Sequence, residues 1–306
     1  MKRLLVTGRH GFVGSVIANL IERDSSLGSW QLSVLPQDFD LCNADQVRTV
    51  VNEASPDAVL HLAAQTWVPE AIRDPESTLK INVIGTLHLL QALRQDSFGG
   101  PLVFASTGDV YGLVTPDELP VGETRLAAPR NAYAVSKLAA EALCYQWMVT
   151  DEMRVVIARP FNHIGAGQSE RFVISDFARQ VAEIKLGRRE AVVYVGDIDV
   201  TRDFTDVRDV VQAYFALLRD GEPGEIYNVC SGEERTIRSL LQSLALLAGV
   251  EVRIEQDASR LRKSEQRRMR GDPSKVRRAT GWSASTSLDE SLDAMLRYWE
   301  REITSG

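Results

Sequence analysis

Short apolar segments alternate with amphipathic helical segments through the first half of this chain. The sequence predicts strands at residues 2–8, 31–36, 57–64, 101–107 and 154–160, and helices at residues 14–23, 45–54, 77–95 and 132–148. The predicted strands are apolar along almost their whole length, which is typical of strands covered on both faces. The alternation therefore predicts an α/β fold with a doubly wound parallel sheet.

Three glycines follow the first predicted strand at the spacing GxxGxxG, namely Gly8, Gly11 and Gly14. In this position the first permits a sharp turn, the second lets the main chain approach a diphosphate, and the third lets the helix pack against the strand. The helix N-terminus supplies free N–H groups for the phosphates. A Rossmann-like dinucleotide site is therefore expected, and a purely structural turn is the alternative. The residues expected to contact the cofactor are Gly8, Arg9, Gly11, Phe12 and Val13.

The second predicted strand ends in Pro36 and carries no acidic residue there. An acid at that point would bind the ribose 2′-hydroxyl of NAD and repel a 2′-phosphate. Arg9 could instead pair with that phosphate, so we expect NADP(H) to be preferred and NAD(H) to be possible. A solvated loop arginine is the alternative for Arg9. Asp40 and Leu41 are expected beside the adenine.

The regular alternation weakens after Pro160, where several glycine-containing loops and one further apolar segment at residues 191–196 follow. We expect residues 1–160 to form an NAD(P)-binding Rossmann domain. Residues 161–306 should form mainly a smaller C-terminal substrate-binding lobe, with some segments returning to the first domain. In open α/β sheets, ligands bind in the crevice at the carboxyl ends of the strands.

The bulk composition excludes several classes of protein. A formal net charge of −7 argues against nucleic-acid binding, which normally needs a basic excess. No apolar run approaches the length of a membrane span, and the N-terminal segment lacks a signal-peptide core. The three cysteines, Cys42, Cys144 and Cys230, show no spacing typical of a metal site. We expect a cytoplasmic protein with reduced thiols and no metal.

Tyr133 and Lys137 lie four residues apart in a predicted helix and therefore on one face, one turn apart. No other tyrosine in the chain is followed by a lysine at this spacing. An ammonium beside a phenol favours the phenolate and should lower the pKa of the tyrosine. Such a tyrosine could donate or accept a proton near neutrality. A surface pair without a catalytic role is the alternative.

Two further segments accompany this pair: residues 104–112, Phe-Ala-Ser-Thr-Gly-Asp-Val-Tyr-Gly, and residues 61–64, His-Leu-Ala-Ala. With them the chain resembles the extended short-chain dehydrogenase/reductase family over nearly its whole length. The resemblance implies catalytic roles for Thr107, which would bind the substrate oxygen, for Tyr133 as acid/base, and for Lys137, which would hold the nicotinamide ribose. The other cofactor contacts that it implies are Leu62, Ala63, Ala64 and Pro160.

Residues 159–168, Arg-Pro-Phe-Asn-His-Ile-Gly-Ala-Gly-Gln, resemble the GDP-mannose branch of that family. This resemblance implies that Asn162 meets the substrate and His163 the cofactor, with Phe172 and Val173 against the guanine. Arg202 would hold the diphosphate, which suits a guanidinium fork. An ion pair with Asp203 or Asp206 is the alternative for Arg202.

Residues 260–265, Arg-Leu-Arg-Lys-Ser-Glu, resemble an Arg-Pro-x-Glu element of related enzymes, with Lys263 in place of the proline. We expect Arg262 on the diphosphate and Glu265 on the ribose. Lys and Arg outnumber acids between residues 251 and 280, so a basic rim for a dianionic ligand is expected. A solvated charged face is the alternative.

The reaction type depends on residues 107–109. The dehydratases that the chain resembles carry Thr-Asp-Glu or Thr-Ser-Glu there, because dehydration needs a base and an acid in addition to oxidation at C4. This chain has Thr107, Gly108 and Asp109. The resemblance therefore implies an NAD(P)H-dependent reductase that converts GDP-4-keto-6-deoxy-D-mannose to GDP-D-rhamnose, for surface-polysaccharide synthesis. Asp109 would contact the sugar.

Two other kinds of function stay open at this point. The chain could be a GDP-mannose 4,6-dehydratase or an NDP-sugar 4-epimerase on the same scaffold, or a non-catalytic nucleotide-binding sensor. The intact set of Thr107, Tyr133 and Lys137 argues against a sensor. The apolar helices around residues 81–93 and 137–147 suggest a homodimer through a four-helix bundle, as in this family, although they could be core.

Overall fold

The computed structural model describes residues 1–23, 29–260 and 266–305. Its main sheet has six parallel strands in the order β2-β1-β3-β4-β5-β9. These strands are β1 (Lys2–Thr7), β2 (Trp30–Leu32), β3 (Ala58–His61), β4 (Leu102–Ala105), β5 (Val155–Pro160) and β9 (Ile226–Val229). The predicted parallel sheet is confirmed.

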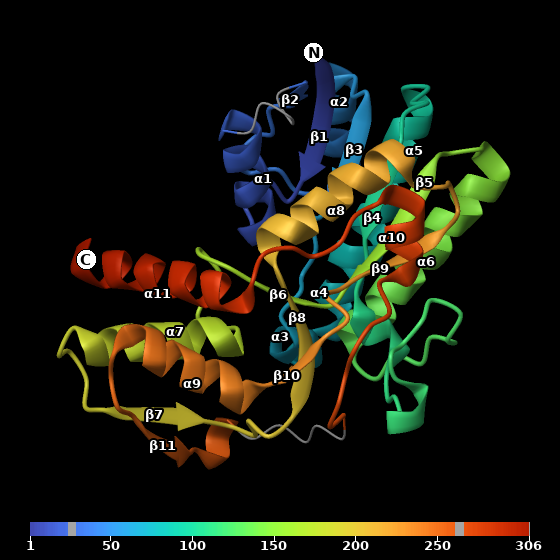
Figure 1. Ribbon diagram of the computed structural model, residues 1–306. Coiled ribbons are helices and arrows are strands. Elements are labelled where there is room, and N and C mark those ends of the chain that lie inside the picture. Colours follow the sequence, from blue (N-terminus) through green and yellow to red (C-terminus); the bar gives the residue numbers. More distant parts are fainter. Residues whose placement is uncertain (24–28, 261–265, 306) are drawn as a thin grey trace.

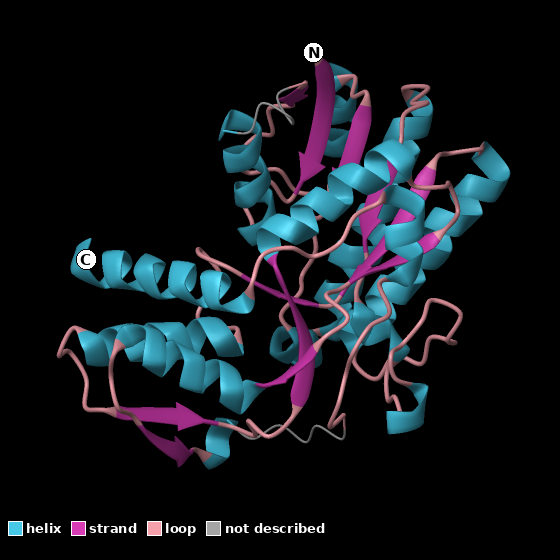
Figure 2. Ribbon diagram, in the orientation of Figure 1, coloured by secondary structure: helices cyan, strands magenta, loops and turns pink. Residues whose placement is uncertain are grey.

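Helices cover both faces of this sheet (Figures 1 and 2). One face packs against α1 (Phe12–Arg23), α8 (Val207–Asp220) and α10 (Ser274–Thr280), and the other against α2 (Ala44–Ala54), α5 (Gly85–Gln95) and α6 (Ala132–Asp151). In β1, Leu4 and Val6 belong to the first core and Leu5 to the second. Successive side chains of a strand point to opposite faces, so covering both faces requires apolar residues throughout.

The second half of the chain contributes to two regions. Strand β9 and helices α8 and α10 join the main sheet. A third core unites α7 (Val173–Lys185), α9 (Ile237–Ala248) and α11 (Leu288–Ser305) with the parallel pair β7 (Val192–Val195) and β11 (Arg253–Gln256). A three-stranded sheet of β10 (Glu234–Thr236), β8 (Thr201–Asp206) and β6 (Asn162–Ile164) lies between the two regions (Figure 1).

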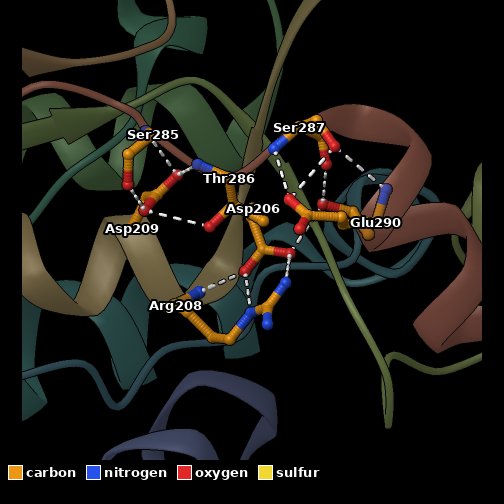
Figure 3. A network of polar contacts seen from close by, with 8 residues as sticks. Asp206, Arg208, Asp209, Ser285, Thr286, Ser287 and Glu290 are labelled. Carbon is orange, nitrogen blue, oxygen red and sulfur yellow. Dashed lines mark hydrogen bonds and ion pairs between the residues drawn. The ribbon is translucent and has the colours of Figure 1, made fainter.

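Two buried carboxylates tie the start of α8 to α11 and to the segment that leads into it (Figure 3). Asp206 caps α8 and accepts a hydrogen bond from the Ser291 hydroxyl at 2.6 Å. Asp209 accepts the main-chain N–H groups of Ser285 and Thr286 at 2.9 and 2.8 Å, and both of their hydroxyls at 3.1 and 3.2 Å. The third core is thereby fastened to α8, a helix that packs against the main sheet.

Several elements differ from the prediction: the strands expected at residues 57–64 and 101–107 cover only Ala58–His61 and Leu102–Ala105. Residues 77–95 were expected to form one helix, but they run from α4 (Pro75–Leu79) through a π-helical turn (Lys80–Ile84) into α5. Within that turn the buried Asn82 side chain accepts from the Gln65 N–H at 2.8 Å and donates to the Ser136 hydroxyl at 2.8 Å. The predicted strand at 31–36 ends at Leu32, because the chain then leaves the sheet and Val34 is exposed.

The remaining short elements are α3 (Val68–Arg73) and three 3-10 turns at Gly108–Tyr111, Pro116–Glu118 and Ala258–Arg260. Across the described residues, no helix combines the length and apolar character that crossing a membrane would require.

Candidate active site

The main chain of the glycine loop, at the carboxyl end of β1, packs closely against the main chain of residues 62–63. Gly8 has a φ of +76°, and a Cβ there would lie 2.8 Å from the Ala63 nitrogen. A Cβ on Gly14 would lie 2.4 Å from the Gly8 carbonyl oxygen. Neither position can hold a larger residue without displacing main chain, so both glycines are needed for the loop to pack closely against residue 63 and the start of α1, whose free N–H groups are suited to a diphosphate.

A buried histidine fixes the neighbouring segment after β3. The Thr7 hydroxyl accepts the Leu62 and Ala63 N–H groups, both at 3.2 Å, and donates to Nδ1 of His61 at 2.7 Å. The other ring nitrogen donates to the Thr86 hydroxyl at 2.9 Å, because that hydroxyl gives its own hydrogen to a main-chain carbonyl one turn earlier. Burial, followed by the nearby Lys137, lowers the pKa of His61 to about 3, so the ring is neutral. The 62–64 segment is thus held beside the glycine loop.

Arg9 extends from the glycine loop to the end of β2. Its guanidinium donates to the Ser33 carbonyl oxygen at 3.3 Å, and the buried Ser33 hydroxyl has no hydrogen-bond partner among the described residues. Asp40 accepts the Cys42 N–H at 2.8 Å. The Leu41 side chain is buried in the core beneath α5, so any contact of this residue with adenine would be made by its main chain.

The three predicted catalytic residues meet where β4 and α6 come together. Thr107 lies just beyond β4, and Tyr133 and Lys137 lie on the first turns of α6. All three are at least 90% buried. Thr107 hydrogen-bonds Tyr133 and also accepts the Asp109 N–H at 3.2 Å. The Lys137 ammonium donates to the Ala105 carbonyl oxygen at 2.6 Å.

The electrostatics of Tyr133 differ from the expectation. Burial raises its pKa, the Asp109 carboxylate raises it further, and the hydrogen bond with Thr107 lowers it. The expected lowering by Lys137 is not found, because the Lys137 ammonium is bound to Ala105 and burial lowers its own pKa to about 8. Tyr133 therefore keeps its proton at neutral pH, which is the form that can protonate a ketone oxygen during reduction.

Asp109 and Arg202 form the charged part of the site. The Asp109 residue is exposed to solvent, yet desolvation by the surrounding protein raises its pKa, and the Arg202 guanidinium lowers it. Arg202 donates to the Thr201 carbonyl oxygen at 2.7 Å, and the carboxylates that act on its pKa are Asp109 and Asp197. An arginine that lies near Asp109, beside the predicted catalytic residues, suits a phosphate-bearing ligand.

The acids proposed as alternative partners of Arg202 are engaged elsewhere. Asp203 accepts N–H groups of Ser231, Gly232 and Gly271 at 2.9 to 3.2 Å. Asp206 forms an ion pair with Arg208 at 2.8 Å.

The segment after β5 carries the other predicted ligand contacts. Pro160 ends β5 in a buried position, and Asn162 is exposed in β6. The His163 and Phe12 rings are parallel within 8°, with centroids 6.1 Å apart, so β6 lies beside the start of α1 here. Nδ1 of His163 donates to the Phe161 carbonyl oxygen at 3.2 Å, and burial lowers the pKa of His163, which leaves Nε2 as an acceptor.

Two apolar side chains stand exposed where α7 begins. Phe172 is 39% and Val173 44% exposed, which suits a flat nucleobase packed against them. Arg262 and Glu265 lie outside the described residues. The basic rim expected around them is partly neutralised, because Arg260, Arg267 and Arg268 pair with carboxylates of Asp176, Asp197 and Glu234.

The prediction overlooked two charged residues behind the catalytic ones. Glu141 and Arg159 form a buried ion pair, with a 2.6 Å contact between the guanidinium and the carboxylate. Two signals were available in the sequence. Glu141 follows Lys137 by four residues on an otherwise apolar helix face, and Arg159 interrupts an apolar strand. Charges in such positions are rarely buried without partners.

The chain is similar to known proteins over nearly its whole length. The sequence model of a family described as GDP-mannose 4,6 dehydratase matches residues 31–295. The GDP-6-deoxy-D-mannose reductase of Pseudomonas aeruginosa is 49% identical over 302 residues, which are 99% of this chain and 98% of that protein. The GDP-mannose 4,6-dehydratase of Yersinia enterocolitica is 27% identical over an alignment that covers 97% of this chain and 93% of that protein.

Among solved structures, one described as RMD from Pseudomonas aeruginosa complexed with NADPH superposes with a TM-score of 0.94. It is 49% identical, and the match covers 99% of this chain and 100% of that chain.

Proposed function

Since the chain belongs to the GDP-mannose 4,6-dehydratase family, we propose that it is an NADPH-dependent reductase that converts GDP-4-keto-6-deoxy-D-mannose to GDP-D-rhamnose. The observation that carries the proposal is a buried, protonated Tyr133 bound to Thr107, next to a Gly108 that offers no acid for dehydration. The relative named as a reductase, at 49% identity, supports it over the dehydratase at 27%.

The cofactor site fits a dinucleotide with a 2′-phosphate. Gly8 and Gly14 hold the closely packed loop at the start of α1, where helix N–H groups would bind a diphosphate, and Arg9 lies at the end of β2 where an acid would favour NAD. The structure described as complexed with NADPH supports NADPH as the cofactor. When bound, NADPH supplies the hydride that reaches C4 of the sugar.

The residues of the chain supply the proton and the orientation. Thr107 binds the C4 carbonyl oxygen, and Tyr133 donates its hydroxyl proton to that oxygen. Lys137 holds the nicotinamide ribose. Because burial and Asp109 keep the pKa of Tyr133 raised, the proton is present throughout the neutral range. These contacts orient the ketone beside the proton donor, which accounts for much of the catalysis in such a site.

The substrate contacts come mainly from the second half of the chain. We assign the guanine to Phe172 and Val173, the diphosphate to Arg202 with Arg262, the ribose to Glu265, and the sugar to Asn162 and Asp109. The core built from α7, α9 and α11 would then be the substrate lobe that faces the nucleotide-binding sheet. We also propose a cytoplasmic location, which the free thiols of the chain favour.

The Asp109→Asn variant separates this proposal from the dehydratase alternative. The substitution keeps the shape and removes the basic charge, so reduction of the 4-keto sugar should stay within roughly tenfold of wild type, about 1.4 kcal/mol in barrier. The measurement is oxidation of NADPH, followed by absorbance, with identification of the product sugar. Wild-type protein given GDP-mannose and oxidised cofactor should form little or no 4-keto-6-deoxy product.

Efficient formation of that product by wild type, abolished in Asp109→Asn, would establish the dehydratase instead. An epimerase would interconvert the C4 configuration of a nucleotide sugar without added reductant. A protein that binds NADPH and the 4-keto sugar, but neither oxidises NADPH nor reduces the sugar, would be a sensor.

We propose in addition that two copies pair through α5 and α6. The outer face of α6 is apolar along its length, with Val135, Tyr145 and Val149 exposed by 43%, 58% and 57%, and Ile84 before α5 is exposed by 41%. A second copy presenting the same stripe would bury these side chains in a four-helix bundle. Light scattering after size exclusion should show a dimer for wild type and a monomer for Tyr145→Arg/Val149→Asp.

Leu246→Asp is the matched control, because Leu246 is 82% exposed on α9, outside the proposed interface. It should leave the dimer intact. A dimer that persists in the α6 variant would place the interface elsewhere.

A further inference from the structure

One face of α6 is in contact with three consecutive residues at the end of β4. Tyr133, Lys137 and Glu141 lie four residues apart along the helix and are all buried. Tyr133 hydrogen-bonds Thr107, and the Lys137 ammonium donates to the Ala105 carbonyl oxygen at 2.6 Å. Glu141 accepts the hydroxyl hydrogen of Ser106. Each turn of the helix therefore has its own contact with residues 105–107.

Arg159 of β5 completes this arrangement from the neighbouring strand. Its guanidinium binds the Glu141 carboxylate in the bidentate manner, with Nε–Oε1 at 2.9 Å and the second contact at 2.6 Å. The same guanidinium lies 4.8 Å from the centroid of the Tyr111 ring. The Tyr111 hydroxyl donates to the Asn228 side chain of β9 at 2.7 Å. Ser106 and Tyr111, the first and last residues of the segment 106–111, therefore both contact the Glu141–Arg159 ion pair.

We infer that the Glu141–Arg159 ion pair positions the catalytic residues by fixing the register of α6 against the end of β4. A bidentate guanidinium–carboxylate pair fixes the relative orientation of the two side chains as well as the distance between them. Its side chains are only 4% and 5% exposed, and buried pairs of this kind contribute little net stability compared with apolar residues of similar size. The ion pair should therefore act mainly on the positions of the catalytic residues, because a displacement of 1 Å can lower the catalytic rate about 100-fold.

The double variant Glu141→Leu/Arg159→Met tests this inference. It removes both charges together, so that no buried charge is left unpaired. We expect kcat, counted per NADPH-binding site, to fall by about 10- to 100-fold. The KM for the 4-keto sugar and the Kd for NADPH should stay within about threefold of wild type, because Arg9, Arg202 and the glycine loop are untouched. A kcat within twofold of wild type would overturn the inference.

Ser106→Ala provides a second test that leaves the ion pair itself intact. It removes only the hydroxyl that joins Glu141 to the catalytic segment, so the protein should fold even where the double variant does not. We expect kcat to fall by about three- to tenfold with KM unchanged, on the scale of one lost hydrogen bond. An unchanged kcat in Ser106→Ala would also contradict the inference.

Asp209→Asn is the control for a general loss of stability. The buried Asp209 carboxylate holds Ser285 and Thr286 before α11, as Figure 3 shows, and an amide would set its NH₂ against N–H donors. We expect a lower melting temperature and a kcat per NADPH-binding site within twofold of wild type. A fall equal to that of the double variant would mean that the ion pair acts through stability alone.

The inference rests on the proposed reductase reaction, and the two can fail separately. A wild-type protein that binds NADPH but does not reduce the 4-keto sugar would refute the proposed function. A wild-type protein that reduces it, together with variants that do so equally well, would refute the positioning role alone.

Discussion

Replacing Tyr133 by phenylalanine should lower reduction of the 4-keto sugar about 100-fold or more while NADPH still binds. The phenylalanine ring fills the same buried space but has no hydroxyl, so it can neither donate the proton nor bind Thr107. The substitution does not alter the glycine loop or Arg9, so the cofactor should bind as it does to wild type. The measurement is a pair of experiments on one preparation: NADPH titration by fluorescence, and NADPH oxidation with the 4-keto sugar.

The same substitution at Tyr194 serves as its control. Tyr194 is 39% exposed on β7, away from Thr107 and Lys137, so Tyr194→Phe should keep wild-type turnover. If Tyr133→Phe turned over substrate nearly as fast as wild type, Tyr133 would not be the proton donor.

Replacing Arg9 by alanine should weaken NADPH binding by about 1.5–3 kcal/mol, the scale of a hydrogen bond to a charged group. This corresponds to roughly 10- to 150-fold in Kd. The Arg9 guanidinium already lies at the end of β2, where it donates to the Ser33 carbonyl oxygen. The 2′-phosphate of NADPH at this point would bind the Arg9 guanidinium. NADH has no 2′-phosphate, so it has no such contact to lose. Binding of NADH should therefore change little.

Titration of both reduced cofactors into wild type and variant measures this difference. Arg48→Ala, which removes an exposed arginine of α2, should change neither affinity. Equal weakening of NADPH and NADH in Arg9→Ala would assign Arg9 to the shape of the loop and not to the phosphate.

The parallel sheet, the glycine loop and the spacing of Tyr133 and Lys137 could be predicted because each depends on residues close together in the chain. A strand covered on both faces needs apolar residues throughout, as in β1, and a turn with a φ of +76° needs a glycine at residue 8. Helical periodicity puts residues four apart on one face whatever surrounds them.

The environment of these residues was decided only by the tertiary structure. The pKa of Tyr133 is raised, because burial and the Asp109 carboxylate both disfavour the phenolate, while the Lys137 ammonium is bound to Ala105. Glu141 finds Arg159 only because β5 lies beside β4 in the sheet. Arg260 reaches Asp176 across 84 residues of sequence. Local conformation follows from neighbouring residues, whereas desolvation and charge pairing depend on which distant segments pack together, and this packing determines the chemistry of the site.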